Sequence, residues 1–223
     1  LLVVYEILDE QNLKEIKDAK SNITGYSYDD FDRLVTTAYT DGTTEGYAYD
    51  NAGNLITKTT RAGQSIEYTY DALNRVTIKS LRGGTEGADE AISYTYDIAS
   101  RLTDAVDSAS SIKYSYDSLN RVARVESSSP KTANAKVVSY GYDKNSNRVK
   151  LNYPDGAYIT YSYDQLNRLI AILNDQDQQI SFYSYDVLSR RTNLTLGNGR
   201  VTDYAYDNIN RLISLSLRAY WLN

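Results

Sequence analysis

Short runs in which apolar and polar residues alternate recur along the whole chain. One run is Ile66-Glu67-Tyr68-Thr69-Tyr70, and residues 112–116 and 159–163 follow the same pattern. Alternation with a period of two places one set of side chains on one face of a β-strand. The pattern therefore predicts strands that each carry one aromatic face.

These runs end in Tyr-x-Tyr-Asp, and the motif recurs at a nearly constant spacing. Successive aspartates are separated by 21, 21, 26, 20, 26, 21, 22 and 21 residues. Each has tyrosine one and three positions before it, which uses eighteen of the 23 tyrosines. Self-similarity at a fixed period indicates a repeat architecture. The anchor aspartates are Asp29, Asp50, Asp71, Asp97, Asp117, Asp143, Asp164, Asp186 and Asp207.

A turn and a second strand are predicted after each anchor. Three residues after it comes Asp, Gly, Asn or Ser, all of which accept turn or left-handed geometry. The following run often opens with Arg-Leu or Arg-Val, and its alternation is less regular, since Leu169 and Ile172 lie three apart, which fits a β-bulge. Turn signals such as Asp41-Gly42 lie between units. Each unit is therefore predicted to be a two-stranded hairpin.

The predicted fold class is all-β, with tandem antiparallel β-hairpins forming one long curved sheet. Residues 1–24 are interpreted as a degenerate partial repeat, because Ile16, Asp18 and Asn22 fall where other units have a second strand and a turn. Residues 25–223 are interpreted as nine repeats in a single repeat domain. The two longer connections, Arg82 to Glu90 and Ser127 to Ala135, are expected to be exposed loops.

Repetition also decides how the motif residues are interpreted. A catalyst needs one special site, whereas nine equivalent copies suggest a structural role. We expect the aspartates to cap loop amides and the arginines to pair along the sheet from solvated positions, and we expect tyrosine to lie beside tyrosine across the sheet in an aromatic ladder. Besides the anchor aspartates, the predicted structural residues are Tyr26, Tyr28, Arg33, Tyr47, Tyr49, Tyr68, Tyr70, Arg75, Tyr94, Tyr96, Arg101, Tyr114, Tyr116, Arg121, Tyr140, Tyr142, Tyr161, Tyr163, Arg168, Tyr183, Tyr185, Arg190, Tyr204, Tyr206 and Arg211.

The unit from Tyr68 to Val76, repeated at about 21 residues, resembles the RHS/YD repeat. In that family such repeats form a β-sheet strip that spirals into a hollow shell. The resemblance implies a shell that encloses a toxic C-terminal domain, as in bacterial polymorphic and insecticidal toxin complexes, or one that serves cell adhesion, as in animal teneurins. It also implies a secreted or cell-surface protein, with the rest of its own polypeptide as principal partner.

The sequence departs from complete family members at its end. Residues 217–223 supply neither the closing segment, with its aspartate-dependent self-cleavage, nor a variable toxin domain. Eighteen strands at about 4.8 Å span roughly 86 Å, less than the circumference on the order of 140 Å needed around a cargo of about 100 residues. The chain also starts in mid-pattern and contains no Met, so we expect a fragment of a larger protein.

Composition narrows the chemistry further. The chain has neither cysteine nor histidine, which excludes thiolate sites, disulfides and histidine triads. The net charge of −5 argues against a nucleic-acid partner. No apolar run approaches the length of a membrane helix, and residues 1–20 contain no signal peptide. We predict no catalytic residue, no cofactor and no metal.

Three alternatives remain open at this level. The segment Asp143 to Asn147 has oxygen ligands at alternate positions, as calcium loops do, but lacks the glycine and closing glutamate of such loops. Rows of exposed tyrosine could bind glycans or a cell-surface partner instead of packing on each other. The repeats could also form a free-standing strip or filament.

Overall fold

A computed structural model describes residues 4–7, 12–83, 90–130 and 134–219 of the chain. Over these residues it contains twenty β-strands and no helix, so the all-β prediction is confirmed. Within the same residues, no helix is long and apolar enough to cross a membrane.

The strands are short, and most match the length of one alternating run. Their bounds are β1 (Val4–Ile7), β2 (Leu13–Lys17), β3 (Ile23–Tyr28), β4 (Leu34–Tyr39), β5 (Thr44–Tyr49), β6 (Leu55–Thr59), β7 (Ser65–Tyr70), β8 (Val76–Arg82), β9 (Glu90–Tyr96), β10 (Leu102–Val106), β11 (Ser111–Tyr116), β12 (Val122–Ser128), β13 (Lys136–Tyr142), β14 (Arg148–Asn152), β15 (Tyr158–Tyr163), β16 (Leu169–Asn174), β17 (Gln179–Tyr185), β18 (Arg191–Leu196), β19 (Arg200–Tyr206) and β20 (Leu212–Ala219).

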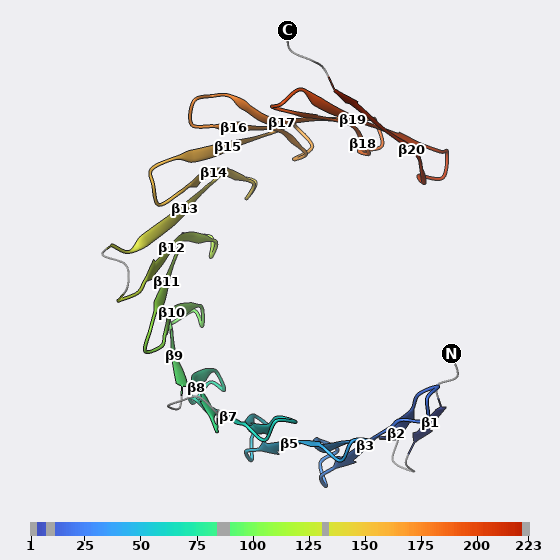
Figure 1. Cartoon of the computed structure of the whole chain (residues 1–223). Coiled ribbons are helices and arrows are strands. Elements are labelled where there is room, and N and C mark those ends of the chain that lie inside the picture. The colour runs from blue at the N-terminus through green and yellow to red at the C-terminus, as the bar shows by residue number, and fades with distance from the viewer. Residues whose placement is uncertain (1–3, 8–11, 84–89, 131–133, 220–223) are drawn as a thin grey trace. The chain divides into compact units, whose positions relative to one another are not determined.

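The chain divides into two compact units, Leu1–Ser111 and Ile112–Asn223. In the first, each strand from β1 to β10 pairs with the next in antiparallel orientation. In the second, the same holds from β12 to β20. Figure 1 shows the neighbouring strands of each unit side by side in chain order. Each unit is therefore an antiparallel meander.

The loop after each Tyr-x-Tyr strand reverses the chain through one left-handed residue. At Asp164, for example, the Asn167 N–H donates to the Asp164 carbonyl at 3.0 Å, and Asn167 has a φ of 59°. Such a turn needs a residue that tolerates positive φ. All nine positions three residues after an anchor have positive φ, as the sequence predicts: Asp32, Gly53, Asn74, Ser100, Asn120, Ser146, Asn167, Ser189 and Asn210.

A β-bulge follows this loop and explains the irregular second strand. Tyr163 lies opposite Leu169 and Ser162 opposite Ala171, so Ile170 is an extra residue. Leu169 and Ile172 can therefore lie three apart without leaving the pattern, and the predicted bulge is confirmed. The same shift occurs in the other Tyr-x-Tyr hairpins whose register is described, as between Ser27 and Tyr28.

The predicted tyrosine ladder is wrong. Tyr26 lies opposite Thr37 and Tyr28 opposite Leu34, and in the next hairpin Tyr49 lies opposite Leu55. The reason is that each hairpin contributes a second strand, which separates consecutive tyrosine strands by two strand spacings, about 9.6 Å. The motif tyrosines are half-buried by aliphatic, threonine and cationic neighbours instead.

Neither unit has a buried core of the usual kind. In the described part of the chain the buried apolar residues are Ala171 and Val201, and no large side chain is fully buried. Each unit is a single-layer sheet, so adjacent hairpins must be held together edge to edge.

Two details at the ends of strands differ from the sequence interpretation. The expected loops at Arg82 to Glu90 and Ser127 to Ala135 lie partly outside the described residues, but Arg82 ends β8, Glu90 begins β9 and Ser127 belongs to β12. These strands are longer than predicted because their pairing continues, with Ser65 opposite Arg82.

In residues 1–24, β1 pairs with β2, and Asp18 to Asn22 form a turn like those elsewhere. The interpretation of this segment as a degenerate repeat within a single domain stays a prediction.

Candidate functional site

The repeated loop is built around the anchor carboxylate. Asp164 Oδ1 accepts hydrogen bonds from the N–H groups of Leu166 at 2.9 Å and Arg168 at 3.0 Å. A short acceptor side chain that satisfies amides two and four residues ahead stabilises a tight loop, because those amides have no strand partner. Equivalent bonds form at every other anchor aspartate.

The other carboxylate oxygen holds the residue four positions later. Arg168 donates from Nε to Asp164 Oδ2 at 2.7 Å, and its Nη2 lies at the same distance from that oxygen. Both side chains are 23% exposed, so the pair is half-buried and keeps partial access to solvent. The next hairpin covers the guanidinium, as its contacts below show. Hydrogen bonds from the Arg168 amide and guanidinium lower the pKa of Asp164 below its ordinary value.

The second motif tyrosine links each hairpin to the one before it. The Tyr185 hydroxyl donates to the Leu169 carbonyl at 2.8 Å, across the strand boundary from β17 to β16. That carbonyl lies just after the loop, where the bulge removes regular ladder partners. The same bond is formed by Tyr28, Tyr49, Tyr70, Tyr96, Tyr142, Tyr163 and Tyr206.

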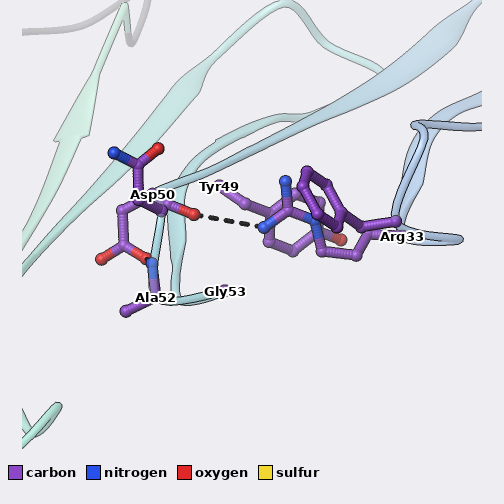
Figure 2. Close-up of a pocket in the computed structure, with 7 residues that line it drawn as sticks. Arg33, Tyr49, Asp50, Ala52 and Gly53 are labelled. Carbon is purple, nitrogen blue, oxygen red and sulfur yellow. Dashed lines mark hydrogen bonds between the residues drawn. The ribbon is translucent and has the colours of Figure 1, made fainter.

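In most repeats the motif arginine links its hairpin to the one after it. Arg33 Nη1 donates to the Asp50 carbonyl at 3.1 Å, and its guanidinium lies 4.7 Å from the centre of the Tyr49 ring. Figure 2 shows this arrangement, with Arg33 beside Tyr49 and the dashed bond to Asp50. Arg75, Arg121, Arg168 and Arg190 repeat both contacts.

One repeat junction also carries a hollow. The hollow of about 480 Å³ beside Arg33 is lined by Phe31, Tyr49 and residues 50–53. Its lining includes Ala52 and Gly53, which stand where the next hairpin has the larger Leu73 and Asn74. The nitrogens of Arg33 are already engaged by Asp29 and Asp50, so the hollow offers an aromatic and apolar surface without a free cation.

A polar cluster on the tyrosine face of the first unit departs from the repeat. Glu45 accepts a hydrogen bond from the Tyr47 hydroxyl at 2.7 Å, and Lys58 Nζ lies 3.7 Å from the same carboxylate oxygen. Burial, followed by the Glu45 contact, raises the pKa of Tyr47 to about 12. Because these groups satisfy each other, the cluster holds neighbouring strands together.

Other predicted chemistry finds no support in the geometry. Asp143 Oδ1 accepts hydrogen bonds from the backbone N–H groups of Asn145 and Asn147. In the segment that resembles a calcium loop, this oxygen is therefore engaged by the loop's own backbone. No group of His, Cys, Asp or Glu side chains that could hold a metal ion is found in the residues described.

Within each unit the anchor aspartates fall on successive hairpins rather than at one point. Sequence reasoning missed the links between hairpins, because their partners are 15 to 22 residues apart. Where a side chain must reach a backbone carbonyl, the partner carries no residue-type signal.

A model of the family described as RHS Repeat matches residues 9–44 and 49–86. The first part of the chain therefore contains RHS repeats. Comparison with curated protein sequences finds no match.

The fold of this chain is similar to that of two solved assemblies. It matches TcdB2-TccC3 with a TM-score of 0.83 and 13% identity, over 97% of this chain and 13% of that chain. It matches the Photorhabdus luminescens Tc holotoxin pore with a TM-score of 0.82 and 14% identity, over 97% of this chain and 12% of that chain. At this identity the likeness is one of fold, and this chain spans about an eighth of those chains.

Proposed function

We propose that this chain is a non-enzymatic wall segment of a larger exported RHS protein whose full form encloses or presents a C-terminal effector domain. The observation that carries the proposal is the repeated junction, which engages the motif Tyr, Asp and Arg groups in holding one hairpin to the next. A catalytic centre would need a group left free for a substrate.

The single-layer sheet supports the same conclusion. A wall must be broad and thin, and its cohesion must come from edge contacts when no core is available. The family resemblance and the likeness to Tc assemblies make an effector carried by the same polypeptide the principal partner. Cofactors and metals have no part in this role.

The test uses the full-length product of the gene that encodes this chain, digested with a protease. The region after the repeats should survive in the wild type and should be cut faster when Arg121, Arg168 and Arg190 are all replaced by Ala, because the wall loosens. Arg124→Ala is the matched control, since Arg124 pairs with Glu126 on its own strand. Equal cleavage rates in all three proteins would rule out enclosure.

A second candidate is a cell-surface adhesion or glycan-binding module, or a free-standing filament. It is favoured by the large apolar residues exposed at the hairpin loops, among them Phe31 at 78% and Ile98 at 107%. Binding of the isolated chain to cells or to a glycan array, lost on Phe31→Ser, would support this candidate over enclosure.

A further inference from the structure

The junctions between hairpins are of two kinds. At an arginine junction, three links cross to the next hairpin: Arg168 Nη1 donates to the Asp186 carbonyl at 3.1 Å and to Ser189 Oγ at 3.2 Å, and its guanidinium lies 4.8 Å from the Tyr185 ring centre. Arg75 and Arg121 reach Ser100 and Ser146 in the same way.

At the other junctions asparagine takes the place of arginine. Asn54 Nδ2 donates to Asn74 Oδ1 at 2.9 Å, and Asn147 Nδ2 donates to Asn167 Oδ1 at 2.8 Å. The shorter side chain reaches only the left-handed loop residue of the next hairpin. Among the described residues, no cation stacks on Tyr70, which follows the Asn54 junction. The Asn147 junction differs, because Arg148 and Lys150 stack on rings across it at 4.8 and 3.8 Å, and Asn145 adds a second hydrogen bond at 3.0 Å.

The loop residue that accepts this bond matches the shorter donor. Asn54 and Asn147 both face an asparagine, and Asn12, in the same position of the first repeat, donates to Asp32 Oδ1 at 2.6 Å. Serine, which serves three of the arginine junctions, would be too short to meet an asparagine donor. An asparagine donor therefore meets an Asx acceptor at these junctions, whereas an arginine donor meets either serine or, at Arg190, Asn210 at 2.9 Å.

The Asn54 junction is also weaker in kind than its arginine neighbours. Hydrogen bonds from a charged donor are roughly twice as strong as neutral ones, and the cation over the ring adds to them. The strand pairing beneath the Asn54 junction is short, since β6 pairs with β7 along Thr57 to Thr59. Within the hairpin, by contrast, β7 pairs with β8 from Ser65 to Tyr70. Opening is therefore easier between hairpins than within one.

We propose that the Asn54 junction, at the β6/β7 boundary, is a built-in seam at which the first unit opens before it opens at the arginine junctions on either side. Those junctions are the β4/β5 boundary, held by Arg33, and the β8/β9 boundary, held by Arg75. The hairpins on either side stay intact during opening, since their own loops and ladders are unaffected. This inference does not rest on the proposed function, because it concerns only how the sheet separates.

Hydrogen exchange of the full chain tests the proposal. Amides that bond across β6/β7 should exchange about fivefold to thirtyfold faster than those across β4/β5 and β8/β9, because a loss of about 1 to 2 kcal/mol of contact energy changes the open population by this factor. Equal protection at these three boundaries in the wild type would overturn the proposal.

Reciprocal exchanges of the pairs sharpen the test. The double variant Asn54→Arg with Asn74→Ser should slow exchange across β6/β7, and Arg168→Asn with Ser189→Asn should speed it across β16/β17 by a similar factor. Asn51→Arg is the charge control, because it adds the same cation to the loop away from the junction. The proposal is overturned if Asn51→Arg slows hydrogen exchange across β6/β7 equally. It is also overturned if the correctly folded double variants leave hydrogen exchange at their own boundaries unchanged.

Discussion

At the scale of single residues, the tyrosine hydroxyl has a defined role. The second tyrosine of the motif is not simply an apolar ring on a strand, because its hydroxyl closes a bond to a backbone carbonyl of the preceding hairpin. Burial of the ring raises the pKa of Tyr185, as expected for a phenol that keeps its proton to donate it. Phenylalanine cannot replace it without leaving that carbonyl unpaired.

Replacing Tyr185 with Phe should therefore lower the free energy of unfolding by about 1–2 kcal/mol, the cost of a lost hydrogen bond with an unpaired acceptor. Tyr153→Phe is the control, because Tyr153 is 41% exposed and should change stability by less than about 0.5 kcal/mol. Urea denaturation of both variants measures the difference. Equal effects would mean that the hydroxyl bond contributes nothing.

Tyr47 makes a prediction about alkaline pH. Its pKa in the folded chain is about 12, above the value of about 10 in an unfolded chain. A raised folded pKa gives stability that is complete below about pH 10 and is lost as the pH rises through the folded value. Glu45→Gln removes the neighbouring charge and should lower this pKa, though burial keeps it above normal. Phenolate absorbance of each protein, minus that of its Tyr47→Phe form, reports the titration; no change on Glu45→Gln would contradict the assignment.

At the scale of the element, two local features fix the geometry of each hairpin. The loop after Tyr-x-Tyr is fixed by the anchor carboxylate and a left-handed residue, and the bulge that follows restores the alternation. The connection between hairpins relies on glycine or Asx turns instead. Gly197 is an unusual case, because its N–H donates to the Ile180 carbonyl at 2.9 Å and the chain passes very close to β17.

Gly197→Ala should destabilise the second unit by about 1–3 kcal/mol, the usual cost of forcing an atom into a packed site. A Cβ at this position would collide with the Gln179 carbonyl oxygen, which belongs to the backbone and cannot rotate away. Gly25→Ala is the matched control, since a Cβ there meets nothing within 4 Å. Thermal unfolding of the pair is the measurement, and similar midpoints for both variants would show that the turn relaxes at no cost.

At the scale of the molecule, repetition multiplies small effects. Every anchor aspartate has a lowered pKa; the arginine or asparagine side chain is the largest cause at Asp71 and Asp143, and the arginine amide is the largest at Asp207. Such carboxylates stabilise the fold above their unfolded pKa of about 3.9, and this contribution is lost as the pH falls through the lower folded values. The same sign applies to all of them, so their effects add.

We therefore expect the urea midpoint to be nearly constant from about pH 7 to 5 and to fall steeply below about pH 4. Asp164→Asn keeps one acceptor oxygen but cannot ionise, so it should start less stable at neutral pH and lose less on acidification. Denaturation curves across this pH range make the comparison. A midpoint independent of pH in the wild type would show that the carboxylates are equally satisfied after unfolding.

A further prediction at this scale concerns β20, the last strand of its sheet. All eight of its residues are exposed, with Leu217 at 75% and Leu215 at 53%, and Arg211 beside it is 73% exposed, against 23% for Arg168. An apolar edge strand is a template for pairing with another chain. Sedimentation of the isolated chain should show association that Leu217→Lys abolishes and Leu119→Lys, at an exposed loop, does not. Association that survives Leu217→Lys would place the contact elsewhere.

The sequence by itself determined the hairpin unit, its loops and its bulge, because each depends on residues within a few positions of one another. Period-two alternation, the tolerance of Asn167 for positive φ and the three-residue step from Leu169 to Ile172 are all local signals. The repeat family could be named from the same signals.

Only the tertiary structure decided what lies between the hairpins. It placed a second strand between consecutive tyrosine strands, half-buried the aspartate–arginine pair beneath the next hairpin, and set the Tyr185 hydroxyl on the Leu169 carbonyl. A backbone carbonyl is present at every residue, so no residue type marks it as a partner. The register between strands of different hairpins depends on the bulges and the loop lengths together. Their combined effect is fixed only when the strands pair in the folded sheet.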